Sequence, residues 1–173
     1  MAESANPQSP EHAAEAIEGL SPADQEWLAV VKDVLQEFQP VLGALRDLPQ
    51  LTVDHEHTLE VCRLAKQDPR LGMEQLHCLA CVDYKEYFQL VYILHSMKPE
   101  RTLVIKTDVP YDDPRLPSVT GVWRAAAWYE REAHDLFGVE FDGHPDLSPL
   151  VLYEGFEGYP GRKEFDLYDY QEF

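Results

Sequence analysis

The residues with the most obvious chemistry are two cysteines, Cys78 and Cys81, which form the C-x-x-C pattern of redox dithiols and of zinc half-sites. Both kinds of site need a turn or a helix N-terminus that brings the two sulfur atoms together. This pair instead lies inside a strand-like run, where positions three apart point to opposite faces. The third cysteine, Cys62, is remote in sequence, and an iron–sulfur cluster needs more thiolates than these. We therefore expect reduced structural thiols, with a free-standing metal or thiol enzyme as a distant alternative.

Histidines are the next candidates for chemistry. His55 and His57 would share one face of a strand and could clip a metal ion, but two ligands do not make a site. His77 and His95 fall within strand-like runs, where we expect core or edge histidines. The chain also lacks a phosphate-binding glycine loop and a nucleophile elbow. We therefore predict no catalytic, metal-binding or cofactor-binding residue.

A carboxylate, Glu130, requires a structural explanation. Residues 118–137 are predicted to form a helix that Ser118 caps and Gly138 ends. In a projection at about 100° per residue, Glu130 falls in the middle of the apolar face. Burial of a lone carboxylate costs several kcal/mol, so Glu130 must be paired or multiply hydrogen-bonded inside the fold or at its seam. The apolar side of the projection holds Val119, Val122, Trp123, Ala126, Ala133 and Phe137.

The opposite face of this predicted helix carries an indole. Trp128 lies there among Arg124, Arg131 and Asp135, where a solvated surface would be expected. An aromatic side chain at such a position indicates that a partner covers this face as well. We therefore expect Arg131 and Asp135 to face the partner. The alternative is a solvated charged face with one stray tryptophan.

These residues need a scaffold, and the hydrophobic pattern between residues 50 and 145 predicts one. Residues 102–109 alternate apolar and polar side chains in the manner of a half-buried strand. Short polar connections between three successive strand-like runs indicate an antiparallel meander. We predict an α/β (α+β) fold, a single domain with a mixed or antiparallel sheet and packed helices. The expected elements are a helix at 59–67 and strands at 51–53, 76–83, 88–97 and 102–109.

Two appendages are expected before this domain. Residues 1–20 are acidic and almost free of large apolar side chains, so we predict a flexible acidic tail. Residues 21–49 are predicted to be a helical extension, in which Ser21 caps the first helix and Pro40 interrupts it. A second, shorter helical piece is expected at residues 42–45.

A third appendage, residues 146–173, is predicted to be a partner-wrapping tail. Glycine and proline recur from residue 143 onward and argue against regular structure. The same stretch holds aromatic side chains, which are costly to leave in water and act as anchors at interfaces. The alternative is that the tail folds back on its own domain. The aromatic residues are Tyr153, Phe156, Tyr159, Phe165, Tyr168, Tyr170 and Phe173.

Composition excludes several classes of partner. The chain has 173 residues, enough for one domain with appendages, and a net charge of −18 from 14 Lys and Arg against 32 Asp and Glu. Such a surface repels phosphate backbones, so nucleic acid is not an expected partner. No apolar run approaches the roughly 18 residues of a spanning helix. The first 26 residues lack Lys and Arg, unlike a signal peptide, so we expect the chain to stay in the cytoplasm.

At this point the sequence resembles a known family, the 30 kDa subunit of respiratory complex I, an NADH:quinone oxidoreductase. The resemblance covers about residues 74–173, whereas residues 1–70 do not match it. The motifs that carry it are D-P-R-L-P-S-V at 113–119, Trp123, E-R-E-A-H-D-L-F-G at 130–138, E-F-D-G-H-P-D-L at 140–147, E-G-Y-P-G-R-K-E-F at 157–165 and L-A-C-V-D-Y at 79–84.

The resemblance implies a subunit of the hydrophilic arm of a proton-translocating NADH (or ferredoxin):quinone oxidoreductase. Such a subunit lies at the membrane indirectly, through the complex, on its cytoplasmic, matrix or stromal side. Family members carry no cofactor and pack against the 49 kDa-type subunit and other hydrophilic-arm subunits, near the quinone site. Iron–sulfur clusters, flavin and quinone belong to those partner subunits. The implied role is non-catalytic: the subunit keeps its redox neighbour in position.

Three positions depart from the family pattern. Ser148 stands where Arg or Lys is usual, Tyr159 where His is usual, and Asp166 where Pro is usual. The short C-terminus resembles the compact chloroplast and cyanobacterial versions. The alternative within the wider superfamily is an equivalent subunit of a membrane-bound hydrogenase, a formate hydrogenlyase or a coenzyme F420 oxidoreductase.

The expected partner-binding residues combine the helix at 118–137 with the segment that follows it. They carry charge or an aromatic ring and lie within the motifs above or on the predicted wet face. They are Arg124, Trp128, Glu130, Arg131, Glu132, Asp135, His144, Tyr159, Arg162 and Lys163.

Overall fold

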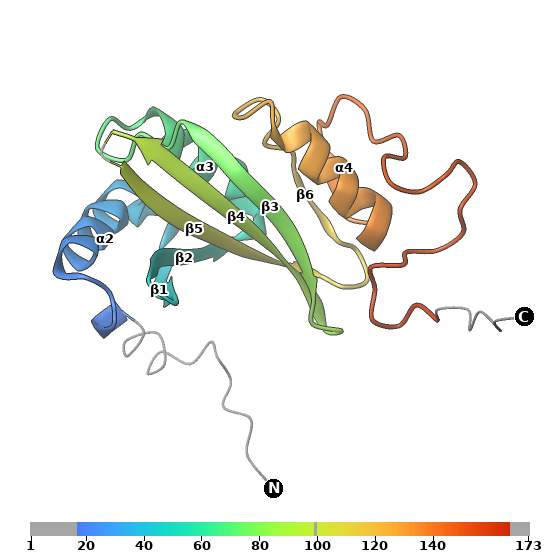
Figure 1. Ribbon diagram of the computed structural model, residues 1–173, viewed down its shortest axis with the longest axis horizontal. Coiled ribbons are helices and arrows are strands. Elements are labelled where there is room, and N and C mark those ends of the chain that lie inside the picture. Colours follow the sequence, from blue (N-terminus) through green and yellow to red (C-terminus); the bar gives the residue numbers. More distant parts are fainter. Residues whose placement is uncertain (1–16, 99, 167–173) are drawn as a thin grey trace, which may run out of the picture.

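Long alternating strands form the centre of the molecule, which we describe from a computed structural model of residues 17–98 and 100–166 (Figure 1). Five strands pair in the order β1-β2-β5-β4-β3. The predicted meander of β3, β4 and β5 is confirmed, because both of its pairings are antiparallel. Strand β2 pairs with β5 in parallel, so the sheet is mixed. The strands are β1 (Val41–Leu45), β2 (Leu48–Asp54), β3 (Gln75–Asp83), β4 (Tyr87–Met97) and β5 (Glu100–Pro110).

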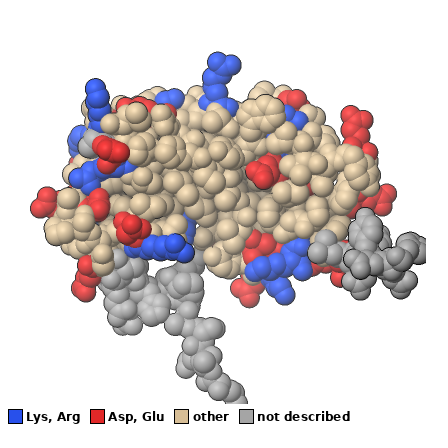
Figure 2. Space-filling model, in the orientation of Figure 1, with Lys and Arg blue, Asp and Glu red and all other residues tan. Residues whose placement is uncertain are grey.

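The core lies between one face of this sheet and the helices. Alternate side chains along β2, β4 and β5 point to that face and are buried, as period-two patterning requires. The other face is not covered by a helix in the view of Figure 1, and Figure 2 shows its charged side chains mostly near the margins. The buried set includes Leu51, Val53, Phe88, Leu90, Tyr92, Leu94, Leu103 and Ile105.

Two helices cover the part of the core toward the left of Figure 1. Helix α2 (Pro22–Val34) begins as predicted, with the Ser21 hydroxyl oxygen accepting a hydrogen bond from the Asp24 N–H at 3.2 Å. Its apolar stripe buries Trp27, Leu28 and Val31 against the core. Helix α3 (Thr58–Gln67) follows a short 3-10 turn, η2 (His55–His57), and buries its own apolar side.

The predicted helical piece at residues 42–45 is wrong, because these residues form strand β1. A two-residue turn, with Arg46 at a positive φ of 57°, joins β1 to β2 in an antiparallel hairpin. Short apolar runs do not distinguish a helix from a strand, and pairing with β2 decides this one. The sheet therefore begins inside the range predicted as a helical extension.

The predicted helix at 118–137 is also wrong in its first part. Regular helix α4 runs from Ala126 to Phe137, and turns occupy the residues before it. Two three-residue strands that the sequence did not indicate, β6 (Arg115–Pro117) and β7 (Glu140–Asp142), pair in parallel on either side of this region. The pairing of β6 with β7 fixes the position of the chain just before the turns that precede α4. The Ser118 hydroxyl oxygen accepts from the Thr120 N–H at 3.2 Å, as a capping serine would, but it precedes turns instead of the regular helix, and the hydroxyl also donates to Glu130.

The expected acidic tail at residues 1–20 lies mostly outside the described residues. Its last part is described: Leu20 is buried in the core, and Ile17 packs against the same cluster. The folded unit therefore begins a few residues earlier than the composition indicated.

Candidate interaction site around α4 and the tail

Helix α4 lies beside the edge strand β3 and carries the candidate residues on two sides. The Tyr129 hydroxyl donates a hydrogen bond to the His77 carbonyl at 2.8 Å and ties the helix to that strand. As predicted, Gly138 ends the helix in the left-handed conformation, with φ at 74°. A substituted Cβ at Gly138 would lie 2.5 Å from the Tyr159 ring, so the glycine also admits this aromatic side chain.

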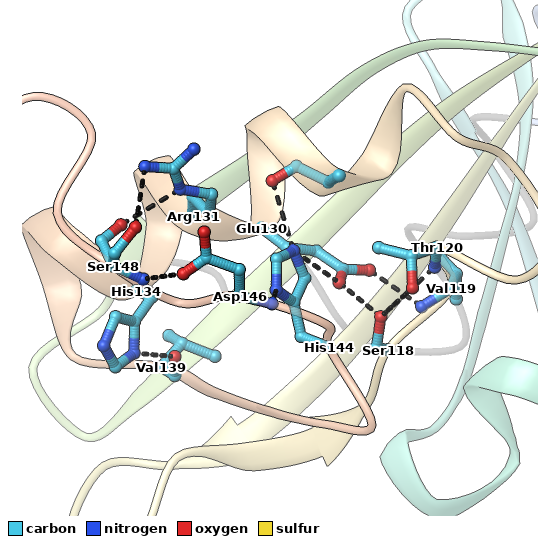
Figure 3. Close-up of polar contacts among 11 residues, drawn as sticks. Ser118, Val119, Thr120, Glu130, Arg131, His134, Val139, His144, Asp146 and Ser148 are labelled. Carbon is cyan, nitrogen blue, oxygen red and sulfur yellow. Dashed lines mark hydrogen bonds and ion pairs between the residues drawn. The ribbon is translucent and has the colours of Figure 1, made fainter.

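On the inner side of α4, Glu130 is completely buried and is held by two hydrogen bonds (Figure 3). Its Oε2 accepts from the Ser118 hydroxyl at 2.6 Å, and its Oε1 accepts from the Val119 N–H at 2.8 Å. Burial raises the pKa of Glu130 to about 7, and the two hydrogen bonds oppose this rise. The prediction that Glu130 is paired inside the fold is confirmed.

A buried histidine completes this inner group. The His144 side chain is only 1% exposed, and its Nε2 lies 4.0 Å from Glu130 Oε2. Nδ1 accepts from the Asp146 N–H at 3.0 Å, which leaves Nε2 to donate to the Ala127 carbonyl at 3.2 Å. These bonds fix the tautomer of the ring and join the start of the tail to α4 (Figure 3). We call Ser118, Glu130 and His144 the buried cluster.

The buried cluster has the residue types of a hydrolytic triad but not its geometry. In such a triad the imidazole takes the proton of the hydroxyl, whereas here the carboxylate binds the hydroxyl directly. The Nε2 of His144 is bonded to a backbone carbonyl. All three side chains are also buried. The arrangement connects segments of the fold.

On the outer side of α4, two charged side chains hold the tail. Arg131 donates to the carbonyls of Ser148 and Pro149, at 3.0 and 2.9 Å. The Oδ2 of Asp135 accepts from three successive backbone N–H groups, those of residues 150, 151 and 152, at 3.1, 2.7 and 2.8 Å. We call Arg131 and Asp135 the tail clamp. Both were expected to face a partner, and the structure places both against this chain's own tail.

Glu130 and Asp135 of α4 have opposite pKa shifts. Burial raises the pKa of Asp135, but the three N–H groups of residues 150–152 outweigh burial and leave the pKa below its ordinary value. Because the donors are backbone groups of an irregular segment, no side-chain pattern in the sequence indicated this role for Asp135. Only the placement of an acidic residue in the last turns of a helix could have drawn attention to it.

The later part of the tail returns to the far end of α4. Arg162 donates to the Phe137 carbonyl at 2.8 Å, and its guanidinium lies over the rings of Phe88, Tyr111 and Tyr159. The Lys163 N–H donates to Asp83 Oδ2 at 2.7 Å. Of the predicted sites, Arg162 is therefore largely engaged within the chain, whereas Lys163 remains exposed.

The tail was expected to dock on another surface, with folding back on its own domain as the alternative. Residues 146–166 contact their own domain through the bonds above, and docking of the same segment on a partner stays a prediction. Its backbone is ordered by α4 in spite of its glycine and proline content. Tyr168, Tyr170 and Phe173 lie outside the described residues.

Aromatic and aliphatic side chains nevertheless remain exposed along α4 and the tail. Trp128 is 62% exposed, with the Arg131 guanidinium 5.5 Å from its ring centroid. Val151 is 58% exposed and Tyr153 is 71% exposed, and Tyr159 is partly exposed at the end of the helix. We call these four residues, Trp128, Val151, Tyr153 and Tyr159, the α4–tail surface. Arg124 and Glu132, two further predicted partner-binding residues, are exposed in the same region of the chain.

Cys78 and Cys81 lie where the sequence indicated, in strand β3. Cys78 and Cys81 pair with Ile93 and Leu90 of β4, which places them on opposite faces of the sheet. Burial, and next the nearby Asp83 carboxylate, raises the pKa of Cys81 to about 12, so this thiol stays protonated at neutral pH. The groove that they border with α4 has a volume of about 260 Å³, below the usual range for ligand pockets.

The histidine predictions have mixed outcomes. His55 and His57 were expected on one face of a strand, which is wrong, because both lie in the 3-10 turn η2. His77 and His95 lie on neighbouring strands at the edge of the sheet, as expected, with ring centroids 4.8 Å apart. Within residues 17–98 and 100–166, no three His, Cys, Asp or Glu side chains gather in a group that could hold a metal ion.

Comparison with known proteins identifies what this arrangement is similar to. Residues 51–171 match the family described as respiratory-chain NADH dehydrogenase, 30 Kd subunit. The C 2 subunit of NADH-quinone oxidoreductase from Rhizobium meliloti (strain 1021) is 42% identical over 134 residues, which span 76% of this chain and 73% of that protein. The corresponding NADH-quinone oxidoreductase subunit of Cupriavidus metallidurans is 43% identical over 154 residues, 83% of this chain and 77% of that protein. The family match begins at residue 51, upstream of the motifs recognised in the sequence.

Two solved structures share the fold. The trypsin-resistant fragment of Nqo5 is 29% identical and superposes with a TM-score of 0.61, covering 70% of this chain and 99% of the fragment. A chain of the membrane-bound sulfane sulfur reductase, an archaeal respiratory membrane complex, is 27% identical with a TM-score of 0.66. The match covers 80% of this chain and 85% of that chain. None of the helices in the described part of the chain has the length and apolar character needed to cross a bilayer.

Proposed function

Because the chain belongs to the family of the 30 kDa subunit of respiratory-chain NADH dehydrogenase, we propose that it is a cofactor-free scaffold subunit of a proton-translocating NADH (or ferredoxin):quinone oxidoreductase. It packs against the 49 kDa-type subunit near the quinone site and holds that subunit in position. Iron–sulfur clusters, flavin and quinone are carried by the partner subunits. The chain itself contributes no catalytic residue.

The observation that carries this proposal is the α4–tail surface. This surface exposes one tryptophan, one valine and two tyrosines, and aromatic side chains are typical anchors of protein interfaces. The polar groups that sequence reasoning singled out on α4 have structural partners instead. Glu130 binds the turn before the helix, and Asp135 binds the tail after it. These polar side chains of α4 therefore maintain the shape of the surface, and in this proposal the redox chemistry belongs to the neighbouring subunits.

The proposed location follows from the complex. Relatives named as NADH-quinone oxidoreductase subunits belong to multisubunit assemblies, and one structural neighbour belongs to a membrane complex. We place this chain on the cytoplasmic, matrix or stromal side, attached to the membrane through its neighbours. Displacements of about 1 Å can change reaction rates in a redox neighbour, which gives a scaffold subunit its importance.

The test is affinity purification of the tagged full-length chain from its own membranes in mild detergent. We expect stoichiometric recovery of a 49 kDa-type subunit and of the iron–sulfur subunits, together with quinone reductase activity. A Trp128→Ala variant should lose most of these subunits. The control is Met97→Ala, which removes an apolar side chain of similar exposure on β4. Recovery of a monomer without complex subunits from wild-type membranes would contradict the proposal.

A second candidate is supported by the similarity to the archaeal sulfane sulfur reductase complex. In this alternative the chain is the equivalent scaffold subunit of a membrane-bound hydrogenase, formate hydrogenlyase or coenzyme F420 oxidoreductase. The same purification separates the two candidates. Flavin-containing NADH-oxidising subunits support the first, and a nickel-containing large subunit supports the second.

A further inference from the structure

The tail clamp binds the backbone of residues 148–152 and leaves the side chain of Val151 exposed. Three successive N–H groups converging on one oxygen form a concave anion-binding arrangement, and here Asp135 fills it. Arg131 binds two carbonyls just before them. Five backbone polar groups of residues 148–152 are therefore bonded to α4, which fixes the course of the loop up to Leu152.

The same loop exposes its apolar side chains. Val151 donates its N–H to Asp135, while its side chain is more than half exposed. Tyr153 is the most exposed large hydrophobic side chain in the described residues, and its ring packs edge-on against Phe156 at 5.4 Å. Val151 thus projects from backbone that is bonded to α4, and Tyr153 follows directly after it, with its carbonyl accepting from the Phe156 N–H at 3.1 Å. A preformed loop loses less conformational entropy on binding than a mobile one.

We propose that Arg131 and Asp135 are positioning residues that preform loop 148–153, so that Val151 and Tyr153 insert into an aliphatic hollow rimmed by Lys and Arg on a neighbouring subunit. The inference rests on the proposed function. The sequence predicted that Arg131 and Asp135 contact the partner directly. In this proposal the two side chains affect the partner indirectly, by fixing the conformation of the loop.

Charge defines the chemistry of that partner surface. Asp146 just before the loop and Glu154 and Glu157 just after it are exposed, and the Arg131 guanidinium is already bonded to the tail. The loop therefore presents apolar side chains within an acidic surround, which a hollow with a basic rim complements. A second copy of this chain fits poorly, because each copy carries a net charge of −18.

The test places the photo-crosslinking residue p-benzoylphenylalanine at position 153 of the tagged full-length chain, in its native membranes. The matched control places it at Met97, which is similarly exposed on β4. We expect position 153 to crosslink to a co-purifying protein of the complex, in a peptide with aliphatic residues and Lys or Arg, at a yield at least tenfold above position 97. A crosslink to a second copy, or no product while the complex co-purifies, overturns the inference and leaves the proposed function standing. Absence of complex subunits from the wild-type purification overturns both.

The positioning role has its own variant series. Asp135→Ala should increase the amide exchange rates of residues 150–152 at least tenfold in the full chain and lower the recovery of partner subunits several-fold, although Val151 and Tyr153 remain. Asp135→Asn, which keeps a carbonyl acceptor, should restore part of both. The double substitution Val151→Ala, Tyr153→Ala should lower recovery without accelerating amide exchange at residues 150–152. Faster exchange with wild-type recovery in Asp135→Ala would overturn the positioning role.

Discussion

Two sides of the same helix use carboxylates to fasten distant segments, yet the two carboxylates have opposite properties. On the inner side, Glu130 has one hydroxyl and one N–H donor within the core, and burial raises its pKa. On the outer side, Asp135 has three N–H donors close to the surface, and its pKa is lowered. The balance between desolvation and the number of donors therefore decides which charge is costly.

This difference separates two functions of α4. The buried cluster joins the helix to the turn before it and to the start of the tail, so it belongs to the stability of the domain. The tail clamp orders a surface loop and contributes little to the packing of the core. Changes on the inner side should alter global unfolding, whereas changes on the outer side should alter local order and assembly.

The largest expected effect is a pH dependence that Glu130 introduces. Its pKa rises from an ordinary 4.5 to about 7, so the folded state binds more protons than the unfolded state between these values. Stability should therefore fall as the pH rises from about 4.5 to about 7, by about 3 kcal/mol at about 1.4 kcal/mol per pKa unit. Glu130→Gln should flatten this part of the profile and be more stable than wild type at pH 8. Urea unfolding of both proteins across this range is the measurement, and superimposable profiles would contradict it.

Removal of the hydroxyl donor should have the next largest effect. Ser118→Ala leaves Glu130 Oε2 without its hydrogen bond in the core, which should cost about 2 kcal/mol at pH 8. The loss should shrink at pH 5, where the carboxyl is protonated. Thr120→Ala is a suitable control, because the Thr120 hydroxyl bonds to Ser118 at 2.8 Å and its loss leaves both donors of Glu130 in place. An equal loss at both pH values would assign the effect to packing instead of to the charge.

The inner side was more predictable from sequence than the outer side, and the reason is physical. Glu130 falls on an apolar helical face, and a buried carboxylate must be satisfied, so its pairing follows from periodicity and desolvation. Its donor Ser118 lies 12 residues away in a turn, and periodicity read that turn as helix. Alternation along residues 102–109 similarly predicted a strand, and the short polar connections predicted the meander, because each of its strands pairs with its sequence neighbour.

The outer side gave no comparable signal. Asp135 is satisfied by backbone N–H groups of an irregular segment, and backbone groups are the same in every residue. The apolar run at β1 was ambiguous for a related reason, since only pairing with β2 distinguishes it from a helix. Features that depend on where a distant backbone passes require the folded structure.

Substitution of Gly161 tests how strongly the later part of the tail, beyond the residues that the tail clamp binds, is held against α4. A Cβ at Gly161 would lie 2.8 Å from the Phe137 ring and 2.9 Å from the Leu136 carbonyl. Gly161→Ala should therefore displace this part of the tail from α4, at a free-energy cost of about 1–3 kcal/mol. The expected result is faster amide exchange at residues 161–165 with little change in exchange at the core strands. Gly121→Ala, at a position with open space and no left-handed backbone, controls for loss of a glycine. Cooperative destabilisation of the whole domain would show that the tail is part of the core.

The smallest effect on stability, and the most informative for the comparison, is expected from Arg131→Ala. Its hydrogen bonds to Ser148 and Pro149 lie near the surface, where such contacts contribute up to about 1 kcal/mol. The midpoint of unfolding should barely move, while protease cleavage within residues 148–153 should become several-fold faster. Recovery of partner subunits should fall at the same time, because the loop no longer presents Val151 and Tyr153 in one conformation. If cleavage accelerates while assembly and turnover stay intact, then loop order does not contribute to assembly, and the outer side of α4 would be no more than a solvated surface.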